Sequence, residues 1–255
     1  MLRPWLAAQN AAAVVHTGDL VRLHPADRAD RELAATELSA AVDGTRLVVP
    51  GNHDVGHGWL DDPEASIEGP TSSALVQAFR AIWGTDRFAH ELGAWLLLGL
   101  NAHVLGTRLP EEAEQDDWLR TTVRDAGDRP LALFLHQPVC LRATSEVLPD
   151  TYKTLSVPPE PRRRLLDLLG PRLHLVASGH LHTARSAVID GVAHVWAPSA
   201  AFTFPIEELA WALPLTSPEA NVTGAVEYRF TDDSVAWGPA LVPGLEPYVY
   251  RPPEP

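Results

Sequence analysis

Metal-binding side chains follow four apolar runs of this sequence. The runs VVHTGD, LVVPGNHD, LALFLH and LVASGHLH supply Asp19, Asn52, His136, His180 and His182. In α/β sheets, polar side chains converge where the chain leaves the carboxyl ends of the strands. Carboxylate, amide and imidazole ligands of this kind suit a borderline transition metal such as Mn, Fe, Zn or Co. The sequence therefore predicts a metal site built from these five residues.

Each motif alone has an ordinary structural interpretation. Asp19 could cap a turn or a helix. His136 could be a packed histidine at a strand end, and the two histidines of HLH could alternate across a strand. Four motifs occur in order, however, and in three of them a glycine precedes the polar residue, which allows a tight turn. The set as a whole favours the metal site.

The elements that must position these residues alternate between strand and helix patterns. Predicted strands cover residues 12–17, 45–50, 95–101, 131–137 and 173–179, and predicted helices cover residues 26–42, 72–82, 110–126 and 160–169. This rhythm predicts an α/β domain with a largely parallel sheet. After Gly179 the pattern changes to short strands at 186–189, 193–196 and 225–230, which we expect to be antiparallel.

Composition limits the classes of partner. The length of 255 residues and the hydrophobic content of 45% predict one globular domain over residues 1–255. The formal net charge is -13 and no stripe of Lys or Arg is present, which disfavours a nucleic-acid polymer as partner. A small phosphoester substrate stays compatible, because a bound cation can reverse the local potential.

The cysteine count and the hydropathy bear on the compartment. Cys140 is the single cysteine, so the fold does not depend on a disulfide and a reducing, cytoplasmic location is expected. No apolar stretch is long enough to span a bilayer, and no membrane association is expected. The sequence leaves the oligomeric state open.

The ordered motifs GD, GNHD, H and GHLH resemble the calcineurin-like metallophosphoesterase family over roughly residues 11 to 205. Within that family, TGDLV, PGNHD, EQDDWL at 114–119 and APS at 197–199 resemble the cyclic-nucleotide phosphodiesterase (class III) branch. The resemblance implies an α/β fold in which a β-sandwich is flanked by helices, in four αββα layers.

The resemblance also implies a role for each residue. Asp19 would bridge two metals, Asn52, His136 and His180 would complete one site, and His182 would bind the other metal. The cofactors would be two divalent or mixed-valence transition metal ions (Mn, Fe, Zn or Co), which polarise the phosphoryl group and activate a hydroxide. His53 would be the general acid or the charge stabiliser at the leaving oxygen, with Asp54 as its orienting partner.

One motif of the family is missing. Family members normally begin with a strand that ends in Asp-x-His and supplies two ligands to the metal held here by His182. No Asp-x-His precedes Asp19 in this sequence. We therefore expect the first, central strand to be absent, either because the sequence is a shortened form of an enzyme or because it is a variant with one complete metal site. Arg22 also stands at a position that is often acidic in this branch, which bears on substrate preference.

Three functions follow. The leading hypothesis is metal-dependent hydrolysis of a small phosphodiester such as a cyclic nucleotide. The second is a catalytically silent domain that binds a metal, a nucleotide or a protein, and the third is a phosphomonoesterase or protein phosphatase. The loops at 55–71 and 138–159 would set the substrate range.

Other residues receive a weaker interpretation. Most remaining histidines are expected to be packed or solvated, although His57 lies just beyond GNHD and could reach the cleft. Residues 162–164, all arginine, are expected to form a solvated helix face. Phe202 and Phe204 could line the cleft or pack in the core.

Overall fold

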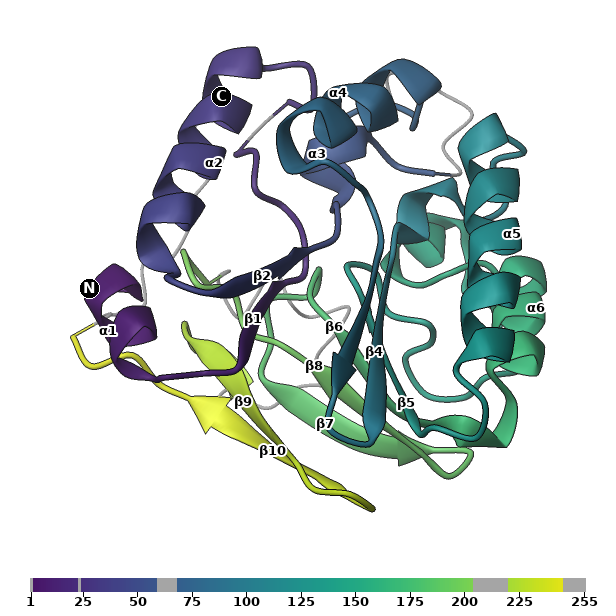
Figure 1. Cartoon of the computed structure of the whole chain (residues 1–255). Coiled ribbons are helices and arrows are strands. Elements are labelled where there is room, and N and C mark those ends of the chain that lie inside the picture. Colours follow the sequence, from purple (N-terminus) through teal and green to yellow (C-terminus); the bar gives the residue numbers. More distant parts are fainter. Residues whose placement is uncertain (1, 23, 59–67, 204–219, 245–255) are drawn as a thin grey trace.

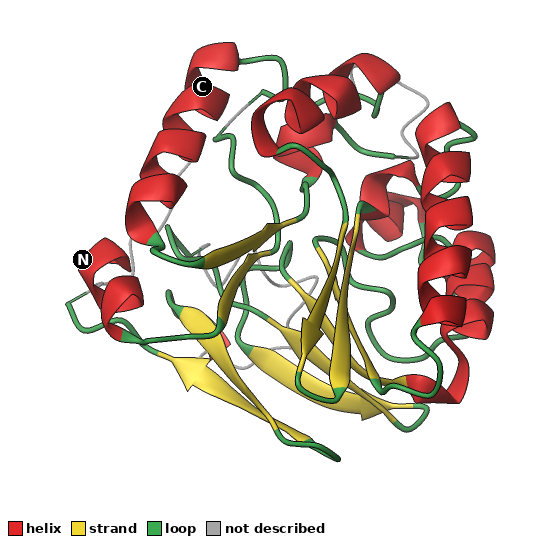
Figure 2. Ribbon diagram, viewed as in Figure 1, coloured by secondary structure: helices red, strands yellow, loops and turns green. Residues whose placement is uncertain are grey.

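The computed structural model describes residues 2–22, 24–58, 68–203 and 220–244. These residues form a mixed α/β fold in which two layers of strands lie between two layers of helices (Figure 1). The layers confirm the fold class that the sequence predicts. Figure 2 shows the helices on opposite sides of the strand layers.

The larger layer is a six-stranded sheet in the order β3-β4-β5-β6-β8-β7. Its strands are β3 (Phe88–Leu92), β4 (Trp95–Leu100), β5 (Leu131–Leu135), β6 (Leu173–Ser178), β8 (Val192–Trp196) and β7 (Arg185–Ile189). Pairing is parallel from β4 through β5 and β6 to β8, and antiparallel at both edges. The strands after Gly179 pair antiparallel with one another, β7 with β8 and β9 with β10, as expected. In addition, β8 pairs with β6 in parallel, because the connection through β7 returns the chain in the direction of β6.

The smaller layer consists of two separate strand pairs. β1 (Ala13–His16) pairs with β2 (Thr45–Val48) in parallel, and β9 (Ala225–Phe230) pairs with β10 (Val235–Ala240) in an antiparallel hairpin. Within the described part of the chain, no strand joins the two pairs.

The core follows from alternation along buried strands. In β4, Leu96, Leu98 and Leu100 face one apolar cluster, while Trp95 and Leu97 face another. Successive side chains of a strand point to opposite faces, so a strand that is apolar throughout must be covered on both sides. One cover is the helix layer of α5 (Pro110–Asp125) and α6 (Pro159–Leu169), and the other is the layer of β1, β2, β9 and β10.

The remaining helices lie at the ends and over the smaller layer. They are α1 (Leu2–Ala8), α2 (Arg28–Ala41), the short α3 (Asn52–Val55), α4 (Ser73–Trp83) and three 3-10 turns, η1 (Ala102–Val104), η2 (Asp150–Leu155) and η3 (Gly170–Arg172). Asp27 and Ser72 cap α2 and α4 by accepting backbone N–H groups of the first turn. These caps explain why both helices begin where the sequence changes from loop to periodic pattern.

Arg162 corrects one expectation. The sequence analysis places residues 162–164 on a solvated helix face, but the Arg162 side chain is 1% exposed. Its guanidinium donates hydrogen bonds to the carbonyl oxygens of Thr144, Glu146 and Val157. Periodicity does not show this role, because the acceptors belong to the loop that precedes α6.

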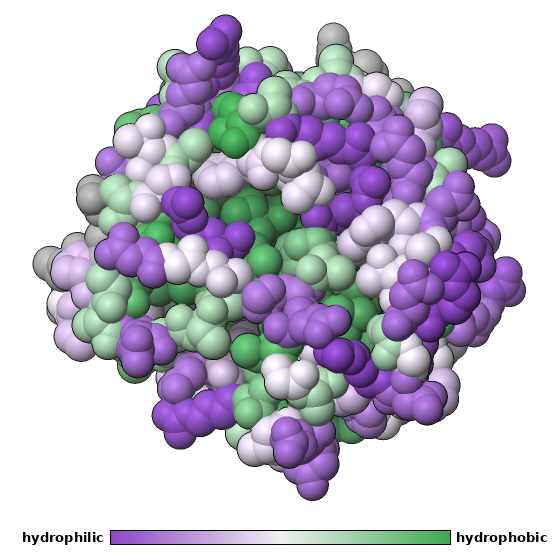
Figure 3. Space-filling model, in the orientation of Figure 1, coloured by the Kyte–Doolittle hydropathy of each residue, from purple (hydrophilic) through white to green (hydrophobic). Residues whose placement is uncertain are grey.

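The surface of the molecule has both apolar and hydrophilic regions. Figure 3 shows apolar residues gathered near the middle of one face and hydrophilic residues around them. A pocket between α2, β2 and α4 is lined by Ala35, Leu47, Ile82, Trp83 and Phe88 among others, and it includes none of the predicted metal ligands. Among the helices of the described residues, none is long and apolar enough to cross a membrane.

Candidate metal centre

Four of the predicted ligands meet at the carboxyl ends of four parallel strands. Asp19 follows β1, Asn52 opens α3 just after β2, His136 directly follows β5, and His180 follows β6. The two strand layers face each other, so the ends of β1 and β2 lie against those of β5 and β6. The fold therefore brings together residues that are up to 161 positions apart in the sequence.

The four side chains converge on the Nε2 atom of His136. This atom lies 3.2 Å from Asp19 Oδ2, 3.1 Å from Asn52 Oδ1 and 3.1 Å from His180 Nδ1. Asp19, His136 and His180 also form the group of metal-binding side chains whose ligand atoms all lie within 4.8 Å of one another among the described residues. His136 and Asn52 are buried, whereas Asp19 and His180 are partly exposed.

Two main-chain carbonyls fix the ring protons of the histidines. His136 Nδ1 lies 2.7 Å from the carbonyl oxygen of Thr17, and His180 Nε2 lies 3.0 Å from that of Thr154. A carbonyl only accepts, so each of these ring nitrogens carries the proton and donates it. In the neutral rings, His136 Nε2 and His180 Nδ1 then present lone pairs to the same point.

The four ligand atoms fit one transition metal. When both rings are neutral, the two imidazole lone pairs, the carboxylate oxygen and the amide oxygen are all hydrogen-bond acceptors and cannot form hydrogen bonds with one another. A cation among them resolves the conflict, and outer hydrogen bonds of the kind made to Thr17 and Thr154 are typical of metal-binding histidines. We conclude that Asp19, Asn52, His136 and His180 could hold one metal ion.

Electrostatics in the metal-free chain point the same way. Burial, together with the nearby His136 and His57, holds the pKa of His180 well below its usual value. Burial alone would lower the pKa of His136, but Asp19 beside it raises that pKa. Burial alone would raise the pKa of Asp19, but His136 lowers it. The cluster thus stabilises one positive charge between Asp19 and His136, a place that a metal ion takes by displacing the proton.

The backbone at the ligands is strained. Asp19, His180 and His182 have φ angles of 57°, 66° and 53°, in the left-handed region that residues with a Cβ rarely occupy. Gly51 permits the close approach, because a Cβ there would lie 2.1 Å from Asp19 Oδ1. Such strain is commonly found at functional sites, where the surrounding structure holds it in place.

Asp54 lies behind the cluster. Its carboxylate accepts the backbone N–H groups of Gly51 at 2.8 Å and of Leu20 and Val21 at 3.0 Å each. Burial, and then the charge of Asp19, raise the pKa of Asp54 to about 6. These contacts tie the turn after β1 to the start of α3, which places Asp19 beside Asn52. The sequence analysis gives Asp54 a different task, as partner of His53.

His53 points its ring at another carboxylate. His53 Nε2 lies 3.1 Å from Glu68 Oε1, and its backbone N–H donates to Asp19 Oδ1 at 3.1 Å. Glu68 also accepts from Asn52 Nδ2 at 3.3 Å. The sequence analysis does not single out Glu68, because it lies in an irregular stretch with no periodic pattern.

Two further histidines border the cluster. His57 and His103 are both buried, and their ring centroids are 5.8 Å apart. His103 also lies 5.7 Å from the His136 ring, and His57 lies 6.1 Å from the His180 ring. The expectation that His57 could reach the cleft thus has a structural counterpart, whereas nothing in the sequence distinguishes His103.

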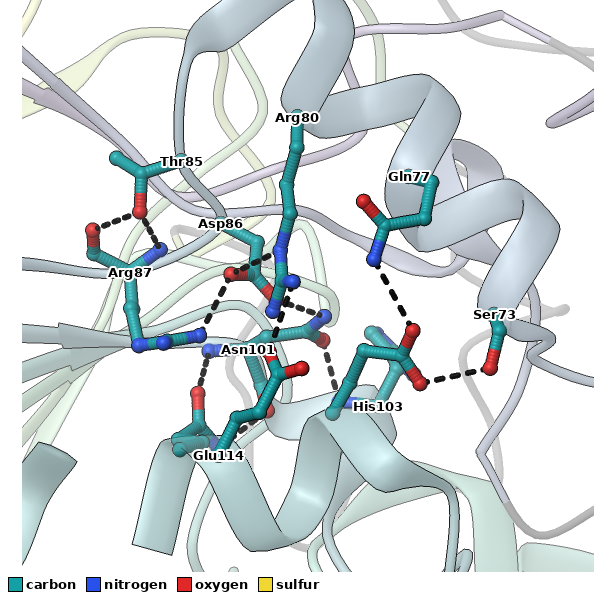
Figure 4. A network of polar contacts seen from close by, with 11 residues as sticks. Ser73, Gln77, Arg80, Thr85, Asp86, Arg87, Asn101, His103 and Glu114 are labelled. Carbon is teal, nitrogen blue, oxygen red and sulfur yellow. Dashed lines mark hydrogen bonds and ion pairs between the residues drawn. The ribbon is translucent and has the colours of Figure 1, made fainter. Parts of the chain in front are cut away.

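A polar network fixes the turn that carries His103 (Figure 4). The side chain of Asn101 accepts the backbone N–H of His103 at 3.0 Å and donates to Asp86 at 3.1 Å. Asp86 is fully buried and also pairs with Arg80 and Arg87. The network therefore holds His103 in place beside the metal ligands, at the end of β4.

His182, the predicted ligand of a second metal, lies in a different environment. Its ring packs edge-on against Phe202 with centroids 4.9 Å apart, and burial lowers its pKa to about 4. Phe204 lies outside the described residues. Within the described ranges, no group of three metal-binding side chains includes His182. The residues present therefore fit one metal better than two.

Comparisons with known proteins identify a family. Residues 2–184 match the model of a family described as calcineurin-like phosphoesterase. A search of curated proteins found no match.

Solved structures show the likeness of fold. A dimetal phosphatase from Danio rerio is 14% identical with a TM-score of 0.56, and the alignment covers 94% of this chain and 85% of that chain. GAP50, the anchor in the inner membrane complex of Plasmodium, is 13% identical with a TM-score of 0.49, over 79% and 65%. The purple acid phosphatase PPD1 from yellow lupin is 15% identical with a TM-score of 0.49, over 74% and 37%.

Proposed function

This chain belongs to the calcineurin-like phosphoesterase family of metal-dependent hydrolases, and we propose that it hydrolyses a small phosphodiester such as a cyclic nucleotide. The observation that carries the proposal is the convergence of three acceptor atoms on His136 Nε2, with both imidazole tautomers set by main-chain carbonyls. The finer substrate class is supported by the motifs TGDLV and PGNHD of the sequence.

Some groups of the site would bind the metal, and others orient the residues that bind it. Asp19, Asn52, His136 and His180 would hold the metal, which we propose to be Mn, Fe, Zn or Co because nitrogen and oxygen ligands are mixed. When bound, the metal supplies Lewis-acid polarisation of the phosphoryl group and activation of water. Thr17 and Thr154 keep the two histidines in the ligating tautomer.

His53 is placed to act on the leaving group. It is the residue next to Asn52, and its side chain is 27% exposed, so a substrate at the cluster can reach it. Its backbone N–H binds Asp19, which fixes its position relative to the ligands. A protonated His53 gives its proton to the leaving oxygen as the P–O bond breaks, so that an alcohol rather than an alkoxide departs.

The partners that we propose follow from charge. The chain carries a net charge of -13, which disfavours a nucleic-acid polymer and leaves a small phosphoester as the substrate. We further propose a cytoplasmic location, supported by the single cysteine, Cys140, which is buried and unpaired.

The experiment that tests the function combines metal analysis with turnover. The purified chain is loaded with manganese, its metal content is measured, and hydrolysis of bis(p-nitrophenyl) phosphate, p-nitrophenyl phosphate and a cyclic nucleotide is compared. We expect metal-dependent turnover with preference for the diesters. In His53→Ala we expect a loss of about 100-fold or more on the cyclic nucleotide, whose alkoxide leaving group needs a proton, which is the scale of a general acid. Turnover that persists after the metal is stripped would exclude the mechanism.

A second function is favoured by a specific observation. Among the described residues, no group of three metal-binding side chains includes His182. A silent domain that binds one metal would follow if the chain took up manganese without hydrolysing any of the three substrates. A preference for the monoester would favour the phosphomonoesterase instead.

A further inference from the structure

One buried carboxylate links a metal ligand to the proposed acid. Glu68 is 8% exposed, and its Oε1 atom contacts both Asn52 Nδ2 at 3.3 Å and His53 Nε2 at 3.1 Å. Its Oε2 atom lies 4.0 Å from His57 Nε2. The nitrogens of Asn52 and His53 lie within hydrogen-bond distance and can donate a proton, so the buried carboxylate of Glu68 is not left isolated.

The backbone holds Glu68 at this place. The segment 68–71 runs beside residues 56–57, with His57 donating its N–H to Gly69 O at 2.8 Å and Thr71 donating to His57 O at 3.0 Å. Gly56 allows the approach, because a Cβ there would lie 2.7 Å from the backbone of Pro70. Since residues 56–57 directly follow α3, the segment with Glu68 is tied to the helix that carries Asn52 and His53.

Asp54 is less suited to orient His53. Three backbone N–H groups already occupy its two carboxylate oxygens, at 2.8 to 3.0 Å. Glu68 instead approaches the His53 ring within ion-pair distance. The geometry therefore separates two tasks between two buried carboxylates, with Asp54 shaping the backbone and Glu68 contacting the ring.

We propose that Glu68 is the positioning residue of His53, an inference that rests on the proposed hydrolytic function. Glu68 Oε1 accepts a hydrogen bond from His53 Nε2–H, so Nδ1 is the nitrogen that serves the leaving oxygen. The proton on Nδ1 goes to that oxygen as the P–O bond breaks, and His53 ends neutral with the other proton still on Nε2, hydrogen-bonded to Glu68. The same carboxylate holds the amide of Asn52 with its Oδ1 toward the metal ligands.

Leaving-group dependence provides the test. Glu68→Gln keeps the size of the side chain and an acceptor for Asn52 but removes the charge beside His53. We expect kcat/KM for a phenyl phosphodiester to fall about 10–100-fold, the usual scale for an outer contact of a catalytic group. For the corresponding p-nitrophenyl diester, kcat/KM should fall by only about threefold or less, because p-nitrophenolate departs without protonation.

Glu111→Gln is the matched control. Glu111 is buried, and it accepts hydrogen bonds from Ser73 at 2.7 Å and Gln77 at 3.2 Å. Loss of this buried carboxylate should lower kcat/KM equally for both substrates or leave it unchanged. Equal losses on both substrates in Glu68→Gln would mean a structural role only, and unchanged kinetics would mean no role, so either result overturns the proposal.

A second measurement does not need turnover. Ring ¹⁵N shifts of His53, detected through its carbon-bound protons at pH 9, report which nitrogen carries the proton. We expect the Nε2–H form in the native chain and in Glu111→Gln, and a shift toward the Nδ1–H form in Glu68→Ala. If the chain lacks activity but shows this change, the proposed function fails while the placement of His53 stands. An identical tautomer in Glu68→Ala would overturn the placement.

Discussion

At the scale of single residues, the site depends on which nitrogen of each ligand ring carries the proton. Thr17 and Thr154 accept one ring proton each from His136 and His180, and this leaves the opposite nitrogens to face the metal position. An outer contact of this kind raises the basicity of the ligand and fixes the plane of its ring. Metal affinity therefore depends on main-chain positions as well as on the ligand side chains.

Two histidine variants distinguish the metal site from its surroundings. His180→Gln removes a nitrogen ligand at the cluster, and we expect manganese affinity to fall by more than the roughly 10–100-fold typical of an outer contact. His182→Gln should keep one metal per chain, because His182 packs against Phe202 and belongs to no group of three ligands in the described ranges. Calorimetric titration with manganese measures both, and equal losses in the two variants would contradict the assignment.

At the scale of elements, helix α6 and the loop before it form one unit through Arg162. The guanidinium binds carbonyl oxygens at Thr144, Glu146 and Val157, and so closes the loop at 138–158 onto the first turn of the helix. Burial lowers the pKa of Arg162, but several carbonyl acceptors compensate the charge. The same loop contains Thr154, so α6 helps to place the acceptor of His180.

Neighbouring arginines on α6 provide a matched comparison. Arg162→Met leaves buried carbonyls without a donor, and we expect the free energy of unfolding to fall by about 1–3 kcal/mol. Arg163→Met, on the exposed side of the same helix, should change it by no more than about 0.5 kcal/mol. Urea unfolding measures both, and similar values for the two variants would show that the hydrogen bonds of Arg162 contribute nothing specific.

Strands with a uniform apolar pattern could be predicted from the sequence, whereas strands with a mixed pattern could not. Strands β4 and β5 are apolar throughout and β6 is mostly apolar, so the sequence indicates their position, and the polar motifs after β5 and β6 supply His136 and His180. Strand β3 was missed because its pattern FAHEL mixes buried and exposed residues at a sheet edge. Strand β10 was missed too, since VAWGPA contains both a glycine and a proline.

Residues that act through irregular backbone were not predictable. Glu68 reaches His53 because residues 68–71 pair with residues 56–57, and such a bridge leaves no periodic signal. The acceptors at Thr17 and Thr154 are main-chain atoms, so their side-chain types carry no information. The burial of Arg162 was not predictable for a related reason, because its partners are main-chain carbonyl groups of the irregular loop before α6.

At the scale of the whole molecule, buried histidines make stability depend on pH. His194 in β8 is 2% exposed and stacks against Trp196, with centroids 6.0 Å apart. Burial lowers its pKa from 6.5 to about 4. The native state therefore takes up this proton less readily than the unfolded chain, so the contribution to stability is complete above pH 6.5 and is lost progressively as the pH falls toward 4.

The pH dependence can be isolated with one substitution. In metal-free protein, we expect protonation of His194 in the unfolded chain to lower the free energy of unfolding by about 2 kcal/mol as the pH falls from 7.5 to 5. His194→Gln does not titrate there, and its loss over the same interval should be smaller by that amount. Urea unfolding of both proteins at the two pH values is the measurement. Parallel losses would show that the His194 ring is hydrated in the native state.

The carbonyl of Thr154 has a consequence for how ligands communicate. It lies in η2, within the loop expected to shape the substrate cleft, and yet it fixes the ring of a metal ligand. A substrate that orders this loop would therefore raise metal affinity, and by thermodynamic reciprocity the metal would raise substrate affinity by the same factor. Occupancy of one position would then act as an allosteric effector of the other, over the length of a single imidazole ring.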